Sequence, residues 1–272
     1  MAIKIAFING KGGCGKTTSI FHITGVLSKA GKKVLIIDFD KQRNTTDTLL
    51  MNTERPENTI YDVMHGALPE SAVARVLFQS RGNAKPKYVG VDCLASDVRL
   101  EDEVALSQVD VERFGKKLDE FIQEWKYDWV LVDMPPSNRI LNHICFTCVV
   151  DFLIVPFSSD VFSVSGYGDI IDTVQKARTL NSTLNILGVY LSRYMANCAV
   201  DTHVREKIKK FDTFIDIQIP LAADVRESIM FGRPISYYKE FSKSRRAYED
   251  LVDEIKKRVV EFRKEVDDGK EF

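Results

Sequence analysis

A glycine-rich segment near the amino terminus carries the residue types that bind phosphate chains. Residues 10–18 read Gly-Lys-Gly-Gly-Cys-Gly-Lys-Thr-Thr and fit the phosphate-loop pattern of Gly, four residues, Gly, Lys and Ser or Thr. Glycines let backbone N–H groups curl around phosphates, because a Cβ would obstruct that approach. We expect Lys16 to contact the β- and γ-phosphates of a nucleotide and the Thr17 hydroxyl to bind Mg²⁺. The predicted nucleotide-binding residues of this loop are Gly10, Lys11, Gly12, Gly13, Cys14, Gly15, Lys16, Thr17 and Thr18.

Acidic residues at the ends of two apolar runs could complete such a site. Asp38 and Asp40 close the run at residues 33–38, and alternation along a strand points both carboxylates to the same side. Asp133 ends the sequence Trp-Val-Leu-Val-Asp, the pattern of a Walker B strand, whose carboxylate holds Mg²⁺ through water. We therefore predict that Asp133 joins Thr17 at a metal ion.

The segments that must position these residues alternate between strand and helix. Residues 3–8 read as a buried strand and 17–30 as a helix, so the glycine loop leads into a helix amino terminus, which favours anions. The whole pattern predicts a single α/β domain at residues 1–263, with a mostly parallel sheet flanked by helices on both faces, and a frayed tail at 264–272. Predicted strands are 33–38, 88–94, 129–133, 152–155, 186–191 and 214–219; predicted helices are 59–65, 71–78, 111–125, 138–149, 164–180, 200–210 and 244–262.

Composition narrows the class of protein. The chain has 272 residues, of which 44% are hydrophobic and 28% charged, as expected of a globular domain with a sizeable core. With a net charge of -1, it gives no bulk sign of nucleic-acid binding, so any DNA contact needs a local basic face. No apolar run approaches the ~20 residues that span a bilayer. The five cysteines are an odd number, and we expect reduced thiols and a cytoplasmic chain.

A second lysine in the loop, Lys11, places these motifs in a known group. The sequence Lys-Gly-Gly-Cys-Gly-Lys-Thr resembles the deviant Walker A ATPases, which include the ParA and MinD partitioning and positioning proteins. The resemblance extends over about residues 2–260. It implies that ATP and Mg²⁺ are the cofactors, that the ATP form is a homodimer, and that Lys11 reaches the phosphates in the partner subunit. Catalytic roles are implied for Lys11, Lys16 and Asp40.

The acidic segments also match the family. Where family members carry Asp-x-Asp-Pro-Gln-Gly-Asn, this chain keeps both aspartates, Gln42 and Asn44 but has Lys41 for Pro and Arg43 for Gly. The resemblance implies that Asp40 orients the attacking water and Asp38 supports the Mg²⁺ shell. Residues 135–137, Pro-Pro-Ser, match the second switch, which senses the γ-phosphate. The adenine is expected between a strand-end loop and an Ile-Pro segment, at Ser192, Arg193, Pro220 and Leu221.

Three further features of the sequence bear on alternative functions. Cys145 and Cys148 could suggest a metallocluster carrier, but their apolar helical context favours a buried helix face. The final helix has a core-facing stripe and an acidic tail, so we expect no membrane binding. Basic residues late in the chain could form a solvated surface or a DNA face; they are Arg205, Lys207, Lys209, Lys210, Lys239, Lys243, Arg245 and Arg246.

The leading interpretation is a ParA-like ATPase that partitions DNA. By resemblance, its ATP-bound dimer would bind DNA nonspecifically at the nucleoid, and a ParB-like adaptor would stimulate slow hydrolysis. The alternative is a MinD-like or polar positioning switch that recruits a protein partner without DNA. Salt-dependent retention of the ATP form on DNA separates the two.

Overall fold

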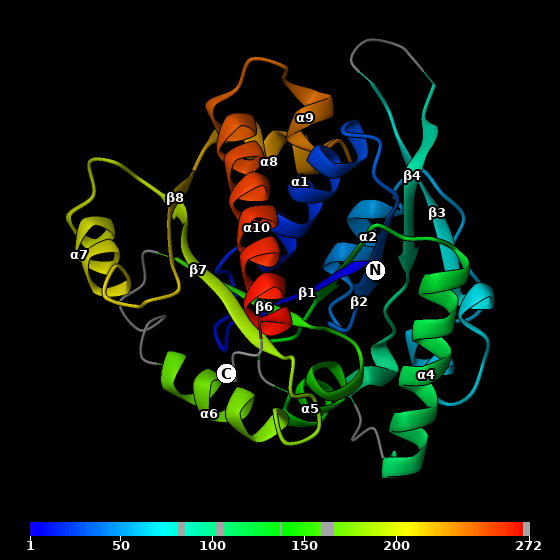
Figure 1. The fold of residues 1–272 in the computed structure, drawn as a ribbon. Helices are drawn as coiled ribbons and strands as arrows, with labels where there is room; N and C mark the ends of the chain where they lie inside the picture. The colour runs from blue at the N-terminus through cyan, green and yellow to red at the C-terminus, as the bar shows by residue number, and fades with distance from the viewer. Residues whose placement is uncertain (81–84, 102–105, 137, 159–165, 269–272) are drawn as a thin grey trace.

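A twisted sheet with helices on both faces forms the body of the protein (Figure 1). The computed structural model describes residues 1–80, 85–101, 106–136, 138–158 and 166–268. Within these ranges the sheet has eight strands in the order β3-β4-β2-β5-β1-β6-β7-β8, and β3 alone among them runs antiparallel. The strands are β1 (Ile3–Phe7), β2 (Val34–Asp38), β3 (Val73–Phe78), β4 (Lys87–Leu94), β5 (Trp129–Asp133), β6 (Phe152–Phe157), β7 (Asn185–Tyr194) and β8 (Phe214–Pro220).

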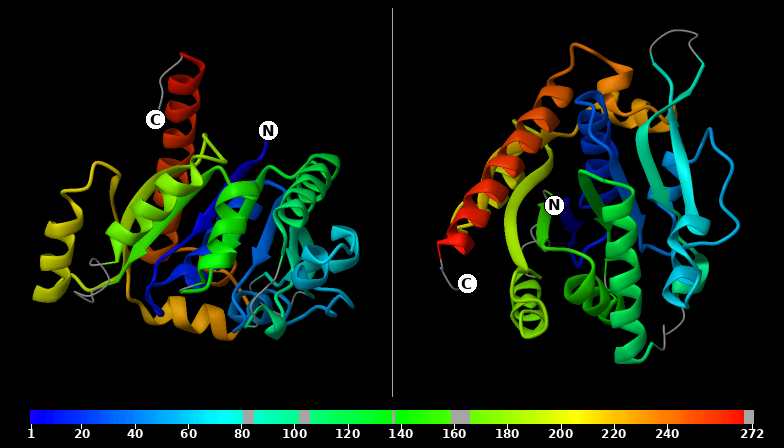
Figure 2. Two further views of the ribbon diagram at one scale, coloured as in Figure 1. Left: turned by 90° about the horizontal axis from the view of Figure 1, so that it is seen from below. Right: turned by 45° about the vertical axis from the view of Figure 1, so that its right-hand side comes forward.

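The helices form two layers, one on each face of the sheet. α1 and α10 pack against one face, and α4, α5 and α6 cover the other, as Figure 2 shows. The α-helices are α1 (Lys16–Lys29), α2 (Asn44–Leu49), α3 (Ile60–Met64), α4 (Gln108–Glu124), α5 (Arg139–Cys148), α6 (Tyr167–Ala177), α7 (Ala199–Ile208), α8 (Ala223–Met230), α9 (Ile235–Tyr238) and α10 (Lys243–Asp267). Short 3₁₀ turns lie at Pro69–Ala72 and Val98–Glu101.

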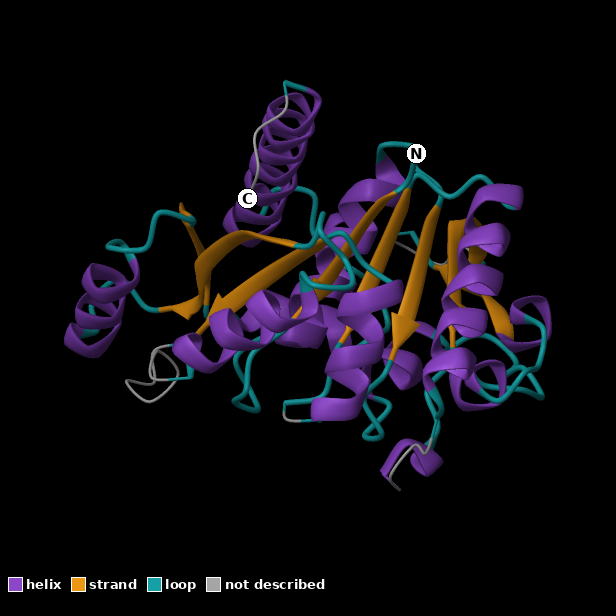
Figure 3. Ribbon diagram, turned by 60° about the horizontal axis from the view of Figure 1, so that its bottom comes forward, coloured by secondary structure: helices purple, strands orange, loops and turns teal. Residues whose placement is uncertain are grey.

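The central strands are buried on both faces, which explains their continuous apolar sequences. Every residue of β2, β5 and β6 is buried. A strand covered by helices on two sides must be apolar at successive positions, whereas a half-exposed strand alternates. The layered arrangement around these strands is visible in Figure 3 and confirms the predicted α/β class.

The prediction of a helix at 71–78 was wrong. Residues 73–78 form β3, which pairs antiparallel with β4. Ala74, Val76 and Phe78 are buried while the residues between them are more exposed, a period of two that fits a strand. Alanine, arginine and leucine in this segment favour a helix locally, but pairing with the sheet edge decides the outcome.

Several element bounds also differ from the prediction. β7 continues to Tyr194, so Ser192 and Arg193 belong to a strand rather than to the loop after it. α10 extends to Asp267, past the expected end at 262, while 269–272 lie outside the described residues. The short helices α2, α8 and α9 were not predicted. None of the helices in the described ranges has both the length and the hydrophobicity needed to span a membrane.

Candidate functional site

The carboxyl ends of the three central strands bring the predicted site residues together. Phe7 of β1 and Asp38 of β2 both lie in register with Asp133 of β5. Because neighbouring parallel strands end at one edge of the sheet, the glycine loop after β1 lies directly beside both carboxylates. The loop then continues into α1 at Lys16. Loop, helix amino terminus and two buried acids therefore form one constellation, as the sequence predicted.

The loop backbone has the shape that its glycines allow. Gly13 and Gly15 adopt φ values of 76° and 93°, which side chains with a Cβ rarely tolerate. A Cβ on Gly15 would also lie 3.0 Å from the Ser192 hydroxyl oxygen. Asn9, which sequence reasoning missed, fixes the entry of the loop: its Oδ1 accepts from the Lys11 backbone N–H at 2.9 Å. The available signal was a polar residue between the apolar run at 3–8 and the loop.

Lys16 is held inside the loop. Its side chain is buried, and its Nζ donates to the backbone oxygens of Asn9 at 3.2 Å and of Lys11 at 3.4 Å. An amine bonded to carbonyls can exchange them for phosphate oxygens, because charged phosphate oxygens are stronger acceptors. Lys16 therefore lies in the loop with its amine bonded to loop carbonyls, and its contact with phosphate stays a prediction.

Three threonines and two aspartates form a network below the loop. The hydroxyls of Thr17 and Thr45 each donate to Oδ2 of Asp133 at 2.6 Å. Thr46 donates to Oδ2 of Asp38 through its hydroxyl at 2.7 Å and its backbone N–H at 2.9 Å. Sequence reasoning gave Thr45 and Thr46 no role, although they follow Asn44 directly in the acidic motif.

This network fits a divalent cation. Burial and the neighbouring Asp133 raise the pKa of Asp38, and burial raises the pKa of Asp133 against the lowering effect of Thr17 and Thr45. Two adjacent buried carboxylates resist ionising together unless a cation compensates them. Oδ1 of Asp133 is also buried without a hydrogen-bond partner. Hydroxyl and carboxylate oxygens are the ligands that Mg²⁺ prefers, and an unpaired carboxylate oxygen can accept from metal-bound water.

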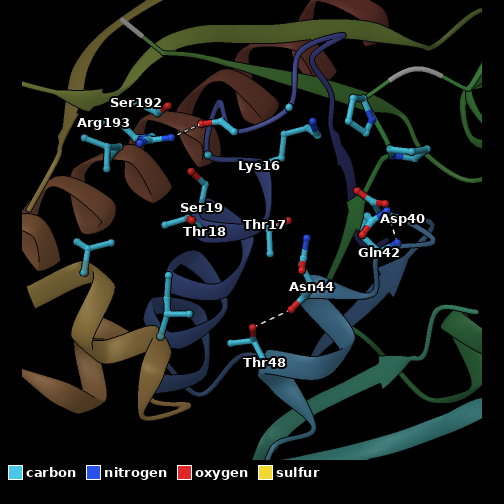
Figure 4. A pocket seen from close by; sticks show the side chains of 18 of the residues that line it. Lys16, Thr17, Thr18, Ser19, Asp40, Gln42, Asn44, Thr48, Ser192 and Arg193 are labelled. Carbon is cyan, nitrogen blue, oxygen red and sulfur yellow. Dashed lines mark hydrogen bonds between the residues drawn. The ribbon is translucent and has the colours of Figure 1, made fainter. Parts of the chain in front are cut away.

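A cavity of about 830 Å³ opens above the loop. That volume suits a nucleotide-sized ligand. Figure 4 shows Ser192 and Arg193 on one side of Lys16 and Thr17, and Asp40 and Gln42 on the other. The predicted site residues that line the cavity are Gly12, Gly13, Gly15, Lys16, Thr17, Thr18, Asp40, Ser192, Arg193, Pro220 and Leu221; Gly10, Lys11, Cys14, Asp38 and Asp133 do not line it.

The two ends of the cavity differ in chemistry. One end is walled mainly by apolar side chains from the end of β8, the residue after it and α8, namely Ile219, Pro220, Leu221, Val225 and Ile229; Arg226 of α8 also lines the cavity. The other end carries Asp40, Lys41, Gln42, Asn44 and Asn138, together with Pro135 and Pro136. A nucleobase suits the apolar end and the terminal phosphate suits the polar end, with the glycine loop between them. Ser137 of the predicted second switch lies outside the described residues.

Ser192 and Arg193 contact the glycine loop. The Ser192 hydroxyl donates to the Cys14 carbonyl and, at 3.1 Å, lies near the Phe157 carbonyl. The Arg193 guanidinium donates to the Gly13 carbonyl at 2.7 Å. Both side chains therefore fix the loop against the end of β7, a role that sequence reasoning did not assign to them.

The loop after β2 is fixed around Asp40. Asp40 is buried; its backbone N–H donates to Asp38, and its carbonyl accepts from the Ser96 hydroxyl at 2.7 Å. Its Oδ1 accepts from the Gln42 N–H at 3.0 Å, and its carbonyl also accepts from the Arg43 N–H at 2.8 Å. These bonds close a tight turn, and Asp40 at its start lines the cavity.

Arg43 adopts a left-handed backbone conformation, with φ 56° and ψ 22°, immediately before α2. A Cβ in this region costs about 1 kcal/mol, and glycine avoids that cost. We therefore expect Arg43→Gly to raise the free energy of unfolding by about 1 kcal/mol relative to Arg43→Ala, measured by urea denaturation. Arg43→Ala is the matched control, since it removes the side chain and keeps the Cβ. Equal stability of the two variants would contradict the prediction.

The cysteine pair lies on α5, away from the site. Cys145 is buried and Cys148 is partly buried, and burial raises the pKa of both thiols. The positions agree with the predicted helix face. Among the described residues, no group of three or more His, Cys, Asp and Glu side chains is arranged to hold a metal ion.

The fold and this site together define a P-loop ATPase of the deviant Walker A type. A family model described as AAA domain matches residues 2–186. The chain is 30% identical over 258 residues to the chromosome-partitioning ATPase Soj of Treponema pallidum, covering 94% of this chain and 97% of that protein. It is 29% identical over 257 residues to the chromosome partitioning protein ParA of Caulobacter vibrioides, covering 92% of each.

A solved structure shares the fold. The putative plasmid partition protein of Borrelia burgdorferi, bound to AMPPNP, superposes with a TM-score of 0.75 at 21% identity, covering 94% of this chain and 99% of that one. The chain belongs to the ParA/MinD-type ATPase family, and both of these relatives are named for chromosome partitioning.

Proposed function

We propose that the chain is a ParA-like DNA-partitioning ATPase that binds Mg·ATP at this site and hydrolyses it slowly. The observation that carries the proposal is the buried network of Thr17, Thr45 and Asp133 beneath a glycine loop that opens on a nucleotide-sized cavity. This arrangement favours a nucleotide with a divalent cation over other ligands. The N–H groups of the glycine loop suit phosphate, and the carboxylates below the loop suit the metal ion.

Each part of the site then has a role in hydrolysis. Lys16 and the loop N–H groups hold the β- and γ-phosphates, and Thr17, Asp38 and Asp133 hold Mg²⁺ directly or through water. Bound Mg²⁺ would neutralise charge that develops on the phosphates. Asp40, on the cavity wall, orients the attacking water. Phosphoryl transfer depends mainly on positioning and charge stabilisation, so turnover stays slow until a partner completes the site.

Dimerisation is proposed to complete the site through Lys11. Lys11 is partly exposed and does not line its own chain's cavity, which supports a contact with the nucleotide in a second copy. Its backbone is fixed through Asn9 and through its carbonyl, which accepts from Cys14 and Lys16. The ATP-bound pair would bind DNA without sequence preference, and a ParB-like adaptor would stimulate hydrolysis and release it at the nucleoid.

Two exposed basic surfaces could contact DNA phosphates, and the first is the start of α10. Lys243 and Arg246 are exposed there. Arg245 is engaged within this surface, because it donates to Glu249 at 2.7 Å and to the Glu240 carbonyl at 2.8 Å. Lys243 and Arg246 are therefore the side chains to test on this helix.

The second basic surface is the end of α7 and the turn after it. Lys207, Lys209 and Lys210 are exposed on this surface. Arg205 of α7 is paired with Asp216, with 2.6 Å between the guanidinium nitrogen and the carboxylate oxygen. The lysines rather than the arginine are therefore the side chains to test here.

Retention on DNA tests this function. The protein with Mg·ATP is expected to bind duplexes of unrelated sequence, with an affinity that falls steeply as salt rises, because counterion release drives such binding. The ADP form is the control and should bind weakly. Lys243→Glu/Arg246→Glu and Lys207→Glu/Lys209→Glu each test one surface; the pair that binds DNA should lower the salt slope by about 0.9 for each phosphate that the variant no longer neutralises. An ATP-bound dimer that ignores DNA at low salt would favour the positioning switch.

A further inference from the structure

Lys41 places a cation on the wall of the proposed nucleotide cavity. It follows Asp40 in the turn after β2, and it lines the cavity with Asp40 and Gln42. The other residues named at the polar end are neutral or acidic. The remaining cations of the cavity lining are Lys16 in the loop, Arg193 of β7 and Arg226 of α8. A second lysine at this end changes what the cavity can bind.

The turn geometry fixes where Lys41 lies. Asp40 accepts from the Arg43 N–H at 2.8 Å, which makes Lys41 the second residue of a four-residue turn. Proline is favoured at that position because its φ is preset, and other residues occupy it readily. The turn is held at Asp40 by the Ser96 hydroxyl and by the Asp38 carboxylate. Lys41 is therefore carried on a braced turn rather than on a free loop.

The position of the turn in the cavity decides which part of a bound nucleotide Lys41 can contact. The apolar end suits the base, so the terminal phosphate extends from the glycine loop toward Asp40, Lys41 and Gln42. ATP presents one more phosphate at that end than ADP does. A lysine there interacts with ATP and with the charge on the transferred phosphoryl group, and much less with ADP.

We propose that Lys41 binds the γ-phosphate of the ATP held by its own chain. The protein then distinguishes ATP from ADP partly through the turn after β2 that carries Lys41. The inference rests on the proposed Mg·ATP site. This contact gives the single chain a higher affinity for ATP than the glycine loop alone would give. It also supplies in cis a cation that stabilises the phosphoryl group as the bond to the β-phosphate oxygen breaks and water adds.

Calorimetric titration with Mg·AMPPNP and with Mg·ADP tests this role. Lys41→Met is expected to raise the Kd for AMPPNP about tenfold, the value of one partly exposed charge-assisted hydrogen bond, and to change the Kd for ADP less than about twofold. Lys41→Arg should restore AMPPNP binding, since it keeps the charge. Lys116→Met, on the exposed face of α4, is the matched control and should leave both affinities unchanged.

Titrations at concentrations where light scattering detects only monomer separate a direct contact from an effect on the dimer. Equal losses for both nucleotides would assign Lys41 to the structure of the turn and overturn the inference, as would unchanged AMPPNP binding. A loss confined to concentrations that support the dimer would also overturn it, because the contact would then belong to the partner. Wild-type protein that binds neither nucleotide would overturn the proposed function itself, and the inference with it.

Discussion

Asp40→Asn is expected to lower the rate of ATP hydrolysis by about 10²–10⁴-fold, the usual contribution of a group that orients or activates a reacting water. Affinity for Mg·ATP should change little, because the phosphates and metal are assigned to Lys16, Thr17 and Asp133. Removing an interaction that acts only in the transition state lowers kcat and leaves ground-state binding intact. Single-turnover hydrolysis and calorimetric binding measure the two quantities separately.

The choice of asparagine follows from the turn around Asp40. Oδ1 of Asp40 accepts the Gln42 N–H, and an amide oxygen can accept the same bond while carrying no charge. Asp40→Ala removes the bond as well, so it should also loosen the turn and lower the melting temperature. If Asp40→Asn hydrolyses ATP at the wild-type rate, Asp40 does not position the water. If the protein is a partitioning ATPase, the trapped ATP dimer should remain on nonspecific DNA longer than wild type does.

The sequence predicted the site best where chemistry restricts residue type. The glycine loop, Lys16, Thr17 and Asp133 were identified because few other residues can surround phosphate and Mg²⁺, and the structure gathers them at one edge of the sheet. The apolar runs of the central strands were equally clear, since burial on both faces leaves little freedom.

What the sequence did not predict depends on tertiary contacts. β3 contains helix-favouring residues and becomes a strand only because β4 offers an edge to pair with. Thr45 and Thr46 carry no local signal of a role until the fold places their hydroxyls on Asp133 and Asp38. Ser192 also gave no signal of its contact with the Cys14 carbonyl, because the two residues are far apart in the chain. Such contacts are set by the packing of whole elements and leave no local pattern.

Lys16→Met is expected to raise the Kd for Mg·ATP at least about 100-fold, since the lysine would provide two charge-assisted hydrogen bonds to phosphates, each worth about 1.5–3 kcal/mol. Methionine is chosen because Lys16 is only 6% exposed, so an unbranched apolar side chain keeps the buried stem. The bonds from Nζ to the Asn9 and Lys11 carbonyls are lost as well, which should relax the loop slightly. Thermal unfolding of the variant without nucleotide measures that smaller effect.

Lys29→Met is the matched control for Lys16→Met. Lys29 is on the same helix, α1, but at its other end, where its amine lies over the Tyr237 ring, 4.4 Å from the centroid. Its loss should leave nucleotide affinity unchanged. An unchanged Kd for Lys16→Met in the same titration would mean that the amine does not bind phosphate. The glycine loop would then need another ligand, because Lys16 is the buried cation of the loop and stands at the amino terminus of α1, where an anion is favoured.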